Sequence, residues 1–169
     1  ISLVLTDAAV DADAWSAMFR RAVDATFNRV SVDGDTSTND SLYGLANGAS
    51  GVRVEADELA VLEKVLTEVL GELAYLLVKD GEGATKLLEC KVTGGKSEAV
   101  AKTVAKSVIC SSLLKAAMFG ADANWGRVLC AIGYSGADVD VTKIGVSFRS
   151  NAGTVEVCRN GSGVPFSEE

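Results

Sequence analysis

The chain has 169 residues, of which 48% are apolar, and it contains a single proline. This composition is sufficient for one compact domain and argues against a disordered chain. The net charge of −7 disfavours nucleic acid or an anionic membrane surface as a partner, because acidic groups repel phosphate. There is no histidine, which excludes the commonest general base and most transition-metal sites.

No apolar run reaches the roughly 18 to 20 residues that a membrane span requires, and the first residues lack the order of a signal peptide. We therefore expect a cytoplasmic protein. The four cysteines (Cys90, Cys110, Cys130 and Cys158) form no CxxC pair, which indicates buried thiols rather than a zinc site. We expect neither a bound metal nor a cofactor.

The spacing of apolar residues predicts the elements of the first half. Apolar residues at the 3.6-residue period indicate helices with one buried face, and short apolar or alternating runs indicate strands. The expected elements are a strand at 1–5, a helix from Asp11 or Asp13 to about Phe27, a short alternating strand-like segment at 29–32, a polar stretch at 33–41 and a long helix over 55–78.

The second half is predicted to be mostly strand. We expect a strand at 84–92, a helix that Ser97 caps, and strands at 113–119, 127–134, 144–148 and 154–159. Helices mixed with strands on short turns favour an α+β layered sandwich over a doubly wound parallel sheet. Because no internal repeat or linker interrupts the chain, we expect residues 1–169 to form a single domain.

Two partial motifs have alternative interpretations. Residues 92–97, VTGGKS, resemble a phosphate-binding loop, but the first glycine of that pattern falls on Cys90, so a helix start is favoured. Residues 30–37 resemble the DxDxT of aspartyl-phosphate phosphatases, with Asp33 as nucleophile and Asp35 as acid and base beside magnesium. That phosphatase stays as an alternative function. A calcium loop is rejected, because its twelfth position would be Gly44.

Three longer segments resemble one family. They are residues 27–40 (FNRVSVDGDTSTND), 80–86 (DGEGATK) and 119–127 (FGADANWGR), with LTDA at 5–8 near the start. In sequence, order and separation they are similar to the ornithine acetyltransferases, the bifunctional glutamate N-acetyltransferases of arginine biosynthesis. The resemblance extends over essentially all 169 residues.

The resemblance implies a layered α/β/β/α sandwich of the self-processing, N-terminal-nucleophile type. In that family a precursor cleaves itself into an α chain and a β chain that begins with a nucleophilic threonine. The present chain then corresponds to part of the β chain. The threonine is expected about two residues before Ile1, and a further substrate-contacting segment is expected beyond Glu169. Thr6 is interpreted as a strand or cap residue.

The implied reaction moves an acetyl group from N2-acetylornithine to glutamate through an acetyl-threonine, with acetyl-CoA as a second candidate donor. The free α-amine of the threonine serves as its base. The implied partner is the α chain of the same precursor, in a heterotetramer of two α and two β chains. Because nucleophile and oxyanion hole lie outside it, the isolated chain is expected to be inactive. A third possibility is a non-catalytic interaction fragment.

The resemblance assigns Glu82 to substrate binding, between two glycines that let the backbone approach a ligand. Without the motif, Glu82 would be interpreted as a solvated loop carboxylate. The further candidates are Lys86, Asp35, Asn39, Asn124 and Arg127. The polar runs that contain the last four can equally be turns whose side chains bond nearby amides, and that interpretation is favoured. We expect Arg127 to form an ion pair with a buried aspartate.

Overall fold

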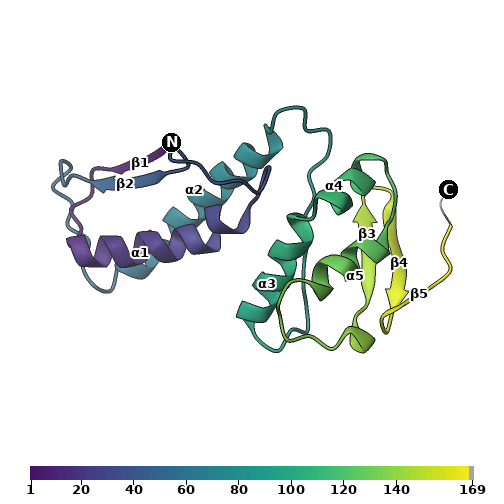
Figure 1. The fold of residues 1–169 in the computed structure, drawn as a ribbon. Helices are drawn as coiled ribbons and strands as arrows, with labels where there is room; N and C mark the ends of the chain where they lie inside the picture. The colour runs from purple at the N-terminus through teal and green to yellow at the C-terminus, as the bar shows by residue number, and fades with distance from the viewer. Residues whose placement is uncertain (168–169) are drawn as a thin grey trace. The chain divides into compact units, whose positions relative to one another are not determined.

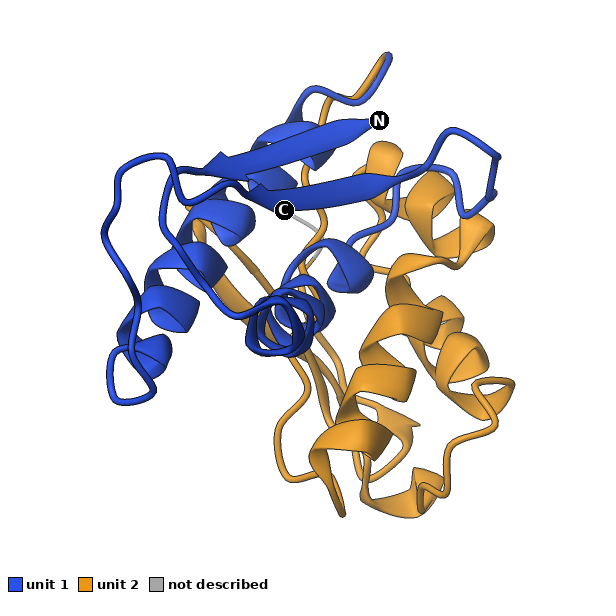
Figure 2. Ribbon diagram, turned by 90° about the vertical axis from the view of Figure 1, so that its left-hand side faces the viewer, with its two compact units in different colours: residues 1–82 blue, residues 83–169 orange. Residues whose placement is uncertain are grey.

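The computed structural model describes residues 1–167, and the chain divides into two compact units. Unit 1 comprises residues 1–82 and unit 2 begins at Gly83 (Figure 2). Each unit is described by itself, and the single domain expected from the sequence stays a prediction. Within the described residues, no helix is both long and apolar enough to cross a membrane.

Unit 1 is a two-stranded parallel sheet covered on one face by helices (Figure 1). Strands β1 (Ser2–Thr6) and β2 (Leu42–Ala46) pair in parallel. Strand β1 confirms the strand predicted at the start of the chain. Helix α1 (Ala12–Ala25) and a short 3-10 helix, η1 (Phe27–Arg29), connect them. Helix α2 (Leu59–Lys79) follows β2 and confirms the predicted long helix.

The core of unit 1 forms where the apolar faces of α1 and α2 meet. Asp11 begins α1, because its carboxylate accepts hydrogen bonds from the amides of Asp13 and Ala14, both at 3.0 Å. Met18 of α1 and Leu70 of α2 are fully buried at this contact. The predicted helical periodicity is therefore confirmed.

The prediction of a short strand-like segment at 29–32 is wrong. Arg29 ends η1, and the three residues after it form no regular structure. The local reason is visible at Thr26, whose hydroxyl donates to the carbonyl of Ala22 at 2.6 Å and whose amide bonds the carbonyl of Val23. These bonds continue the helical turn of α1 into η1 instead of allowing an extended backbone.

Unit 2 packs three helices against an antiparallel sheet of order β3-β4-β5 (Figure 1). Its elements are α3 (Glu98–Ile109), α4 (Ser112–Phe119), α5 (Trp125–Gly133), a 3-10 helix η2 (Val141–Lys143), β3 (Val146–Ser150), β4 (Gly153–Arg159) and β5 (Ser162–Gly163). Val104, Leu114, Val128 and Val157 meet in one core. Each unit thus combines a helical layer with a sheet, as an α+β fold requires.

Two predicted strands of unit 2 are helices. Residues 113–119 belong to α4 and residues 127–133 to α5. Both begin at polar caps, because the Ser111 hydroxyl accepts from the amide of Leu114 and the Asn124 side chain accepts from the amide of Arg127. Short apolar runs are ambiguous between strand and helix in a sequence, and both of these runs are helical in the structure.

The predicted strand at 84–92 is also wrong, since these residues form no regular structure. Its alternation is nevertheless real, because Leu88, Cys90 and Val92 pack against the core of unit 2 while Glu89 and Lys91 are exposed. The alternation correctly predicted which side chains face inward. It could not supply a neighbouring strand to pair with.

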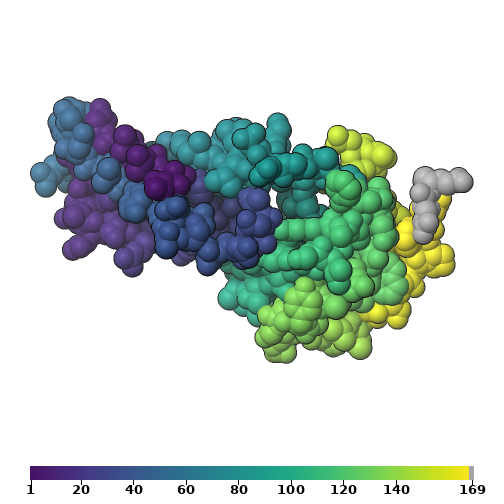
Figure 3. All heavy atoms as spheres, turned by 45° about the horizontal axis from the view of Figure 1, so that its top comes forward, coloured from purple at the N-terminus to yellow at the C-terminus, as the bar shows by residue number. Residues whose placement is uncertain are grey.

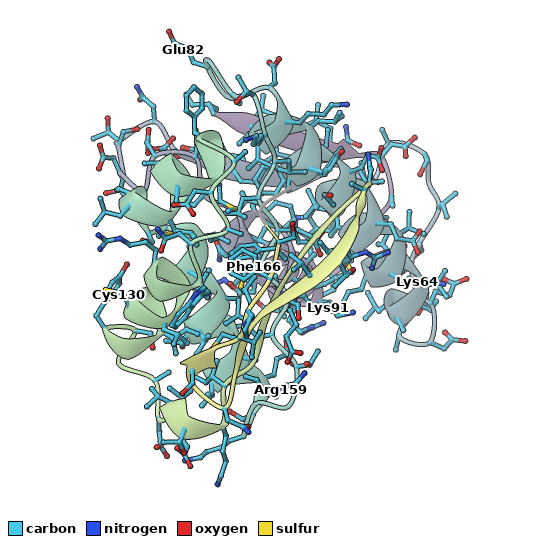
Figure 4. All side chains as sticks on the ribbon, turned by 90° about the vertical axis from the view of Figure 1, so that its right-hand side faces the viewer. Lys64, Glu82, Lys91, Cys130, Arg159 and Phe166 are labelled. Carbon is cyan, nitrogen blue, oxygen red and sulfur yellow. The ribbon has the colours of Figure 1, made fainter. Side chains whose placement is uncertain are left out.

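The interpretation of all four cysteines as buried thiols is partly wrong. Cys158 is buried and Cys90 and Cys110 are half-buried, but Cys130 is exposed on α5 (Figure 4). All four, which lie within the described residues, are free. Burial raises the pKa of the Cys90 thiol and keeps it in the unreactive, protonated form.

Candidate functional site

Glu82 lies at the tip of the turn that follows α2. The cap residue Asp80 ends the helix through bonds from its amide to the carbonyls of Leu76 and Val78. Gly83 then takes a φ of +68°, a left-handed conformation that glycine adopts without strain. The Glu82 side chain is exposed and points away from the ribbon (Figure 4). The carboxylate is therefore accessible to a ligand.

An open hollow of unit 1 lies beside this turn. It has a volume of about 790 Å³ and is bounded by the first residues of β1, by Phe27 and by the last turn of α2. Leu73, Leu76, Lys79 and Asp80 contribute the α2 side. The amino end of β1 and the carboxyl end of α2 thus meet at one hollow, two residues before Glu82.

Thr6 stands at the other end of β1. It is the last residue of the strand, and its hydroxyl accepts a hydrogen bond from the amide of Ala8 at 3.3 Å. This bond is the local turn contact that a Ser or Thr hydroxyl commonly makes. The interpretation of Thr6 as a strand or cap residue is confirmed.

Lys86 is engaged with the protein's own backbone. Its ammonium donates to the carbonyl of Met118 at 2.6 Å and to that of Phe119 at 3.0 Å, both at the carboxyl end of α4. The last carbonyls of a helix carry the negative pole of the helix dipole, which a cation stabilises. The motifs at 80–86 and 119–127, distant in sequence, are therefore joined by Lys86.

The motif at 119–127 forms the corner between α4 and α5. Gly120 ends α4, and Ala121 follows with a φ of +60°. The amide of Ala121 bonds the carbonyl of Met118 at 3.1 Å, and the amide of Asp122 bonds that of Ala117 at 2.9 Å. This pair of bonds is a Schellman motif, in which glycine usually occupies the left-handed position that alanine fills here.

Asn124 begins α5 from the same corner. Its side-chain oxygen accepts from the amide of Arg127 at 3.1 Å, and its amide nitrogen donates to the carboxylate of Asp122 at 2.9 Å. Arg127 is exposed, and within residues 1–167 its guanidinium forms no ion pair. The expected ion pair with a buried aspartate is therefore wrong, because the helix directs this side chain to solvent.

The acidic stretch at 33–41 is held by local turns. The Asp33 carboxylate accepts from the amide of Asp35 at 2.8 Å, and the Asp40 carboxylate accepts from both the amide and the hydroxyl of Ser37. The amide of Asn39 donates to the Ser37 hydroxyl at 3.2 Å. These bonds favour the turn interpretation. Among the described residues, no group of histidine, cysteine and acidic side chains is arranged to hold a metal.

The phosphate-loop-like segment is a helix start, as predicted. The Ser97 hydroxyl accepts from the amide of Val100 at 3.2 Å and begins α3. Lys96, which a phosphate loop would direct at its ligand, instead pairs with Asp138. Neither residue is free to bind phosphate.

Apart from Cys90, the groups with shifted pKa values are exposed side chains held by local hydrogen bonds and ion pairs. A hydrogen bond from Arg21 lowers the pKa of Glu63, and one from Arg159 lowers the pKa of Glu156. A hydrogen bond from Thr142 lowers the pKa of Asp140. Arg21 and Glu63 join α1 to α2, whereas Glu156 and Arg159 both lie on β4 and Asp140 caps η2. None of these contacts is a pair of carboxylates suited to acid–base catalysis.

Comparison with known proteins decides the family. The model of the ArgJ family matches residues 1–169. The chain belongs to the ArgJ family. Two ArgJ relatives named "Arginine biosynthesis bifunctional protein ArgJ" and "ArgJ 1" come from Nitratidesulfovibrio vulgaris and Clostridium acetobutylicum. The chain is 57% identical to the first over 156 residues and 48% identical to the second over 172 residues.

The alignments cover 89% and 100% of the chain, but only 40% and 42% of these relatives. The chain therefore spans about two fifths of the length of the ArgJ relatives it matches. A crystal structure of the "Arginine biosynthesis bifunctional protein argJ" from Bacillus halodurans is similar with a TM-score of 0.86 and 38% identity, over 99% of this chain and 78% of that one. The predicted fold class and the resemblance to ornithine acetyltransferases are confirmed.

Within unit 2, the structure brings two of the sequence-predicted candidate regions together. Lys86 meets the α4–α5 corner that contains Asn124, whereas Asp35 and Asn39 belong to a turn of unit 1. Sequence reasoning missed Ala121, whose backbone shapes the corner. Gly120 at a helix end and Asn124 three residues before Arg127 were the available signals, since glycine and asparagine mark helix ends and starts.

Proposed function

We propose that this chain is part of an acetyltransferase that moves an acetyl group from N2-acetylornithine to glutamate in arginine biosynthesis. The observation that carries the proposal is the ArgJ family match over residues 1–169. Accessible Glu82, on a turn between two glycines, supports it from the structure. The cytoplasm is the proposed compartment, and acetyl-CoA is proposed as a second acetyl donor.

The proposed chemistry needs a nucleophilic threonine, which we propose precedes Ile1 in the precursor. Its hydroxyl attacks the acetyl carbonyl of N-acetylornithine while its own α-amine takes the proton. The amide C–N bond then breaks, and the same proton passes to the departing amine of ornithine. Glutamate then attacks the acetyl-threonine and carries the acetyl group away. The hollow between the amino end of β1 and the end of α2 supports this scheme, because a nucleophile that precedes Ile1 would adjoin the hollow beside the Glu82 turn.

Glu82 is proposed to hold the charged amino acid. A carboxylate attracts the side-chain ammonium of ornithine but repels the side-chain carboxylate of glutamate. One arrangement resolves this conflict: Glu82 bonds the α-amine of the incoming glutamate. A comparison of the KM values for N-acetylornithine and for glutamate in a Glu82 variant tests this arrangement.

The proposed partner is the remaining part of the same precursor, in a heterotetramer of two α and two β chains. The outer face of the β1–β2 sheet supports a partner. Leu3 and Leu5 of β1 are 62% and 69% exposed, and their neighbours Tyr43 and Leu45 of β2 are 53% and 57% exposed. The first residues of the chain, drawn in dark purple, lie at the surface of unit 1 (Figure 3). Parallel sheets are normally covered on both faces, so this apolar face is suited to packing against a further layer.

The test is Glu82→Gln in the full-length protein that contains residues 1–169. We expect its catalytic efficiency for N-acetylornithine to fall about ten- to a hundredfold, because a charge-assisted contact contributes roughly 1.5 to 3 kcal/mol. Self-cleavage, measured on gels, should stay at the wild-type level, since it needs the threonine and its local peptide rather than Glu82.

Glu89→Gln is the matched control, because Glu89 is an exposed carboxylate seven residues away. It should leave the efficiency unchanged. Wild-type efficiency in Glu82→Gln would return Glu82 to the solvated-loop interpretation. Acetyl transfer by purified residues 1–169 alone would contradict the proposal that nucleophile and oxyanion hole lie outside them.

A further inference from the structure

The carboxyl end of α4 has an arrangement that the acetyl-transfer proposal leaves unexplained. The backbone amides of Gly120, Ala121 and Asp122 already bond the carbonyls of Ala116, Ala117 and Met118. The carbonyl of Phe119, which is the last of the helix, receives the ammonium of Lys86. A lysine 33 residues away in the sequence thus completes the end of this helix.

The Lys86 ammonium is committed by these contacts. An ammonium has three donors, and two of them point at the carbonyls of Met118 and Phe119. Both distances, 2.6 and 3.0 Å, are those of direct hydrogen bonds. The negative pole at the end of α4 adds attraction for the same charge. Lys86 is therefore better placed to hold its own segment than to bind a substrate.

The anchor limits where the preceding turn can lie. Three residues lie between Glu82 and Lys86, and the four Cα–Cα steps that join them span at most about 14 Å when fully extended. The residues between them form no regular structure that would fix their path, and Gly83 is the one that turns. The two hydrogen bonds of Lys86 are thus the nearest tertiary restraint on the carboxyl side of the Glu82 turn that the structure describes.

We infer that Lys86 is a positioning residue for Glu82: by bonding the last carbonyls of α4, it holds the Glu82 turn where the carboxylate can meet the substrate. The inference rests on the proposed function of Glu82. Lys86 touches no reacting atom in this scheme. Its effect on catalysis passes through Glu82.

The experiment is a double-mutant cycle in the full-length enzyme. Lys86→Met removes both hydrogen bonds while keeping much of the side-chain volume. It should lower kcat/KM for N-acetylornithine about ten- to a hundredfold, mainly through KM, because a displaced carboxylate loses its contact with bound substrate. In the Glu82→Gln background the same substitution should change kcat/KM by less than about twofold, since the contact is already gone.

Three further variants separate positioning from folding. Lys86→Arg keeps a cation that can donate to two carbonyls and should retain most of the activity. Lys86→Gln keeps a shorter neutral donor and should give an intermediate KM. Lys91→Met removes an exposed lysine of the same segment and should match the unmodified enzyme. A merely structural role would lower thermal stability without this order of KM values.

The outcomes for the two proposals differ. If the unmodified full-length enzyme transfers no acetyl group, the proposed function fails and the inference fails with it. If that enzyme is active and Glu82→Gln is impaired, a full Lys86→Met effect in the Glu82→Gln background would overturn the inference alone. Lys86→Met kinetics within about twofold of the unmodified enzyme would do the same.

Discussion

Replacing Ala121 by glycine should stabilise the end of α4. Ala121 has a φ of +60°, a left-handed conformation that costs an L-residue with a Cβ about 1 to 2 kcal/mol. Glycine adopts it without that strain but loses about 0.5 to 1 kcal/mol more conformational entropy on folding. The difference predicts a net gain of about 0.5 to 1 kcal/mol for Ala121→Gly.

Ala116→Gly is the matched control, because the same atom is deleted from an exposed position inside the same helix. There the backbone is already helical, so glycine should destabilise α4 by about 1 kcal/mol. The same substitution, alanine to glycine, is thus expected to stabilise α4 at position 121 and to destabilise it at position 116. The difference isolates backbone conformation from any effect of losing a methyl group.

Amide hydrogen exchange in the full-length enzyme measures both changes, because it reports local opening without requiring global unfolding. Exchange of the last-turn amides of α4 should become about two- to fivefold slower in Ala121→Gly and about fivefold faster in Ala116→Gly. Faster exchange in Ala121→Gly, or equal shifts of the same sign in both variants, would refute the strain at Ala121.

Two further predictions concern unit 1. In Gly44→Ala, the added Cβ would lie 2.6 to 2.8 Å from three ring atoms of Phe19. This overpacking should lower the free energy of unfolding, measured in urea, by about 1 to 3 kcal/mol, and a second substitution, Phe19→Leu, should recover part of the loss. A hydrogen bond from Arg21 lowers the pKa of Glu63 in the folded protein below its unfolded value of about 4.5. The ionised carboxylate should therefore stabilise the fold fully above that unfolded pKa, and this contribution should be lost as the pH falls through the lower pKa of the folded state. Glu63→Gln should therefore be less stable than wild type at pH 7 and should lose that deficit as the pH falls through the lowered pKa of Glu63 in the folded protein. A deficit independent of pH would contradict the ion pair.

The helices of unit 1 and α3 followed from sequence because their causes are local. Side chains three and four residues apart share a helix face, as Met18 and Ala22 do, and a cap such as Ser97 bonds an amide three residues away. The long family motifs likewise needed no structure to indicate the ArgJ family and to single out Glu82. That the Glu82 carboxylate contacts substrate stays a prediction.

The tertiary structure decided what depends on distant neighbours. Residues 113–119 and 127–133 are too short and too apolar for periodicity to separate strand from helix, and their packing with the rest of unit 2 fixed them as α4 and α5. Residues 84–92 alternate like a strand but have no strand to pair with. Lys86 finds its partners at the carbonyls of Met118 and Phe119, more than 30 residues away, because only the folding of the chain brings its ammonium to the end of α4.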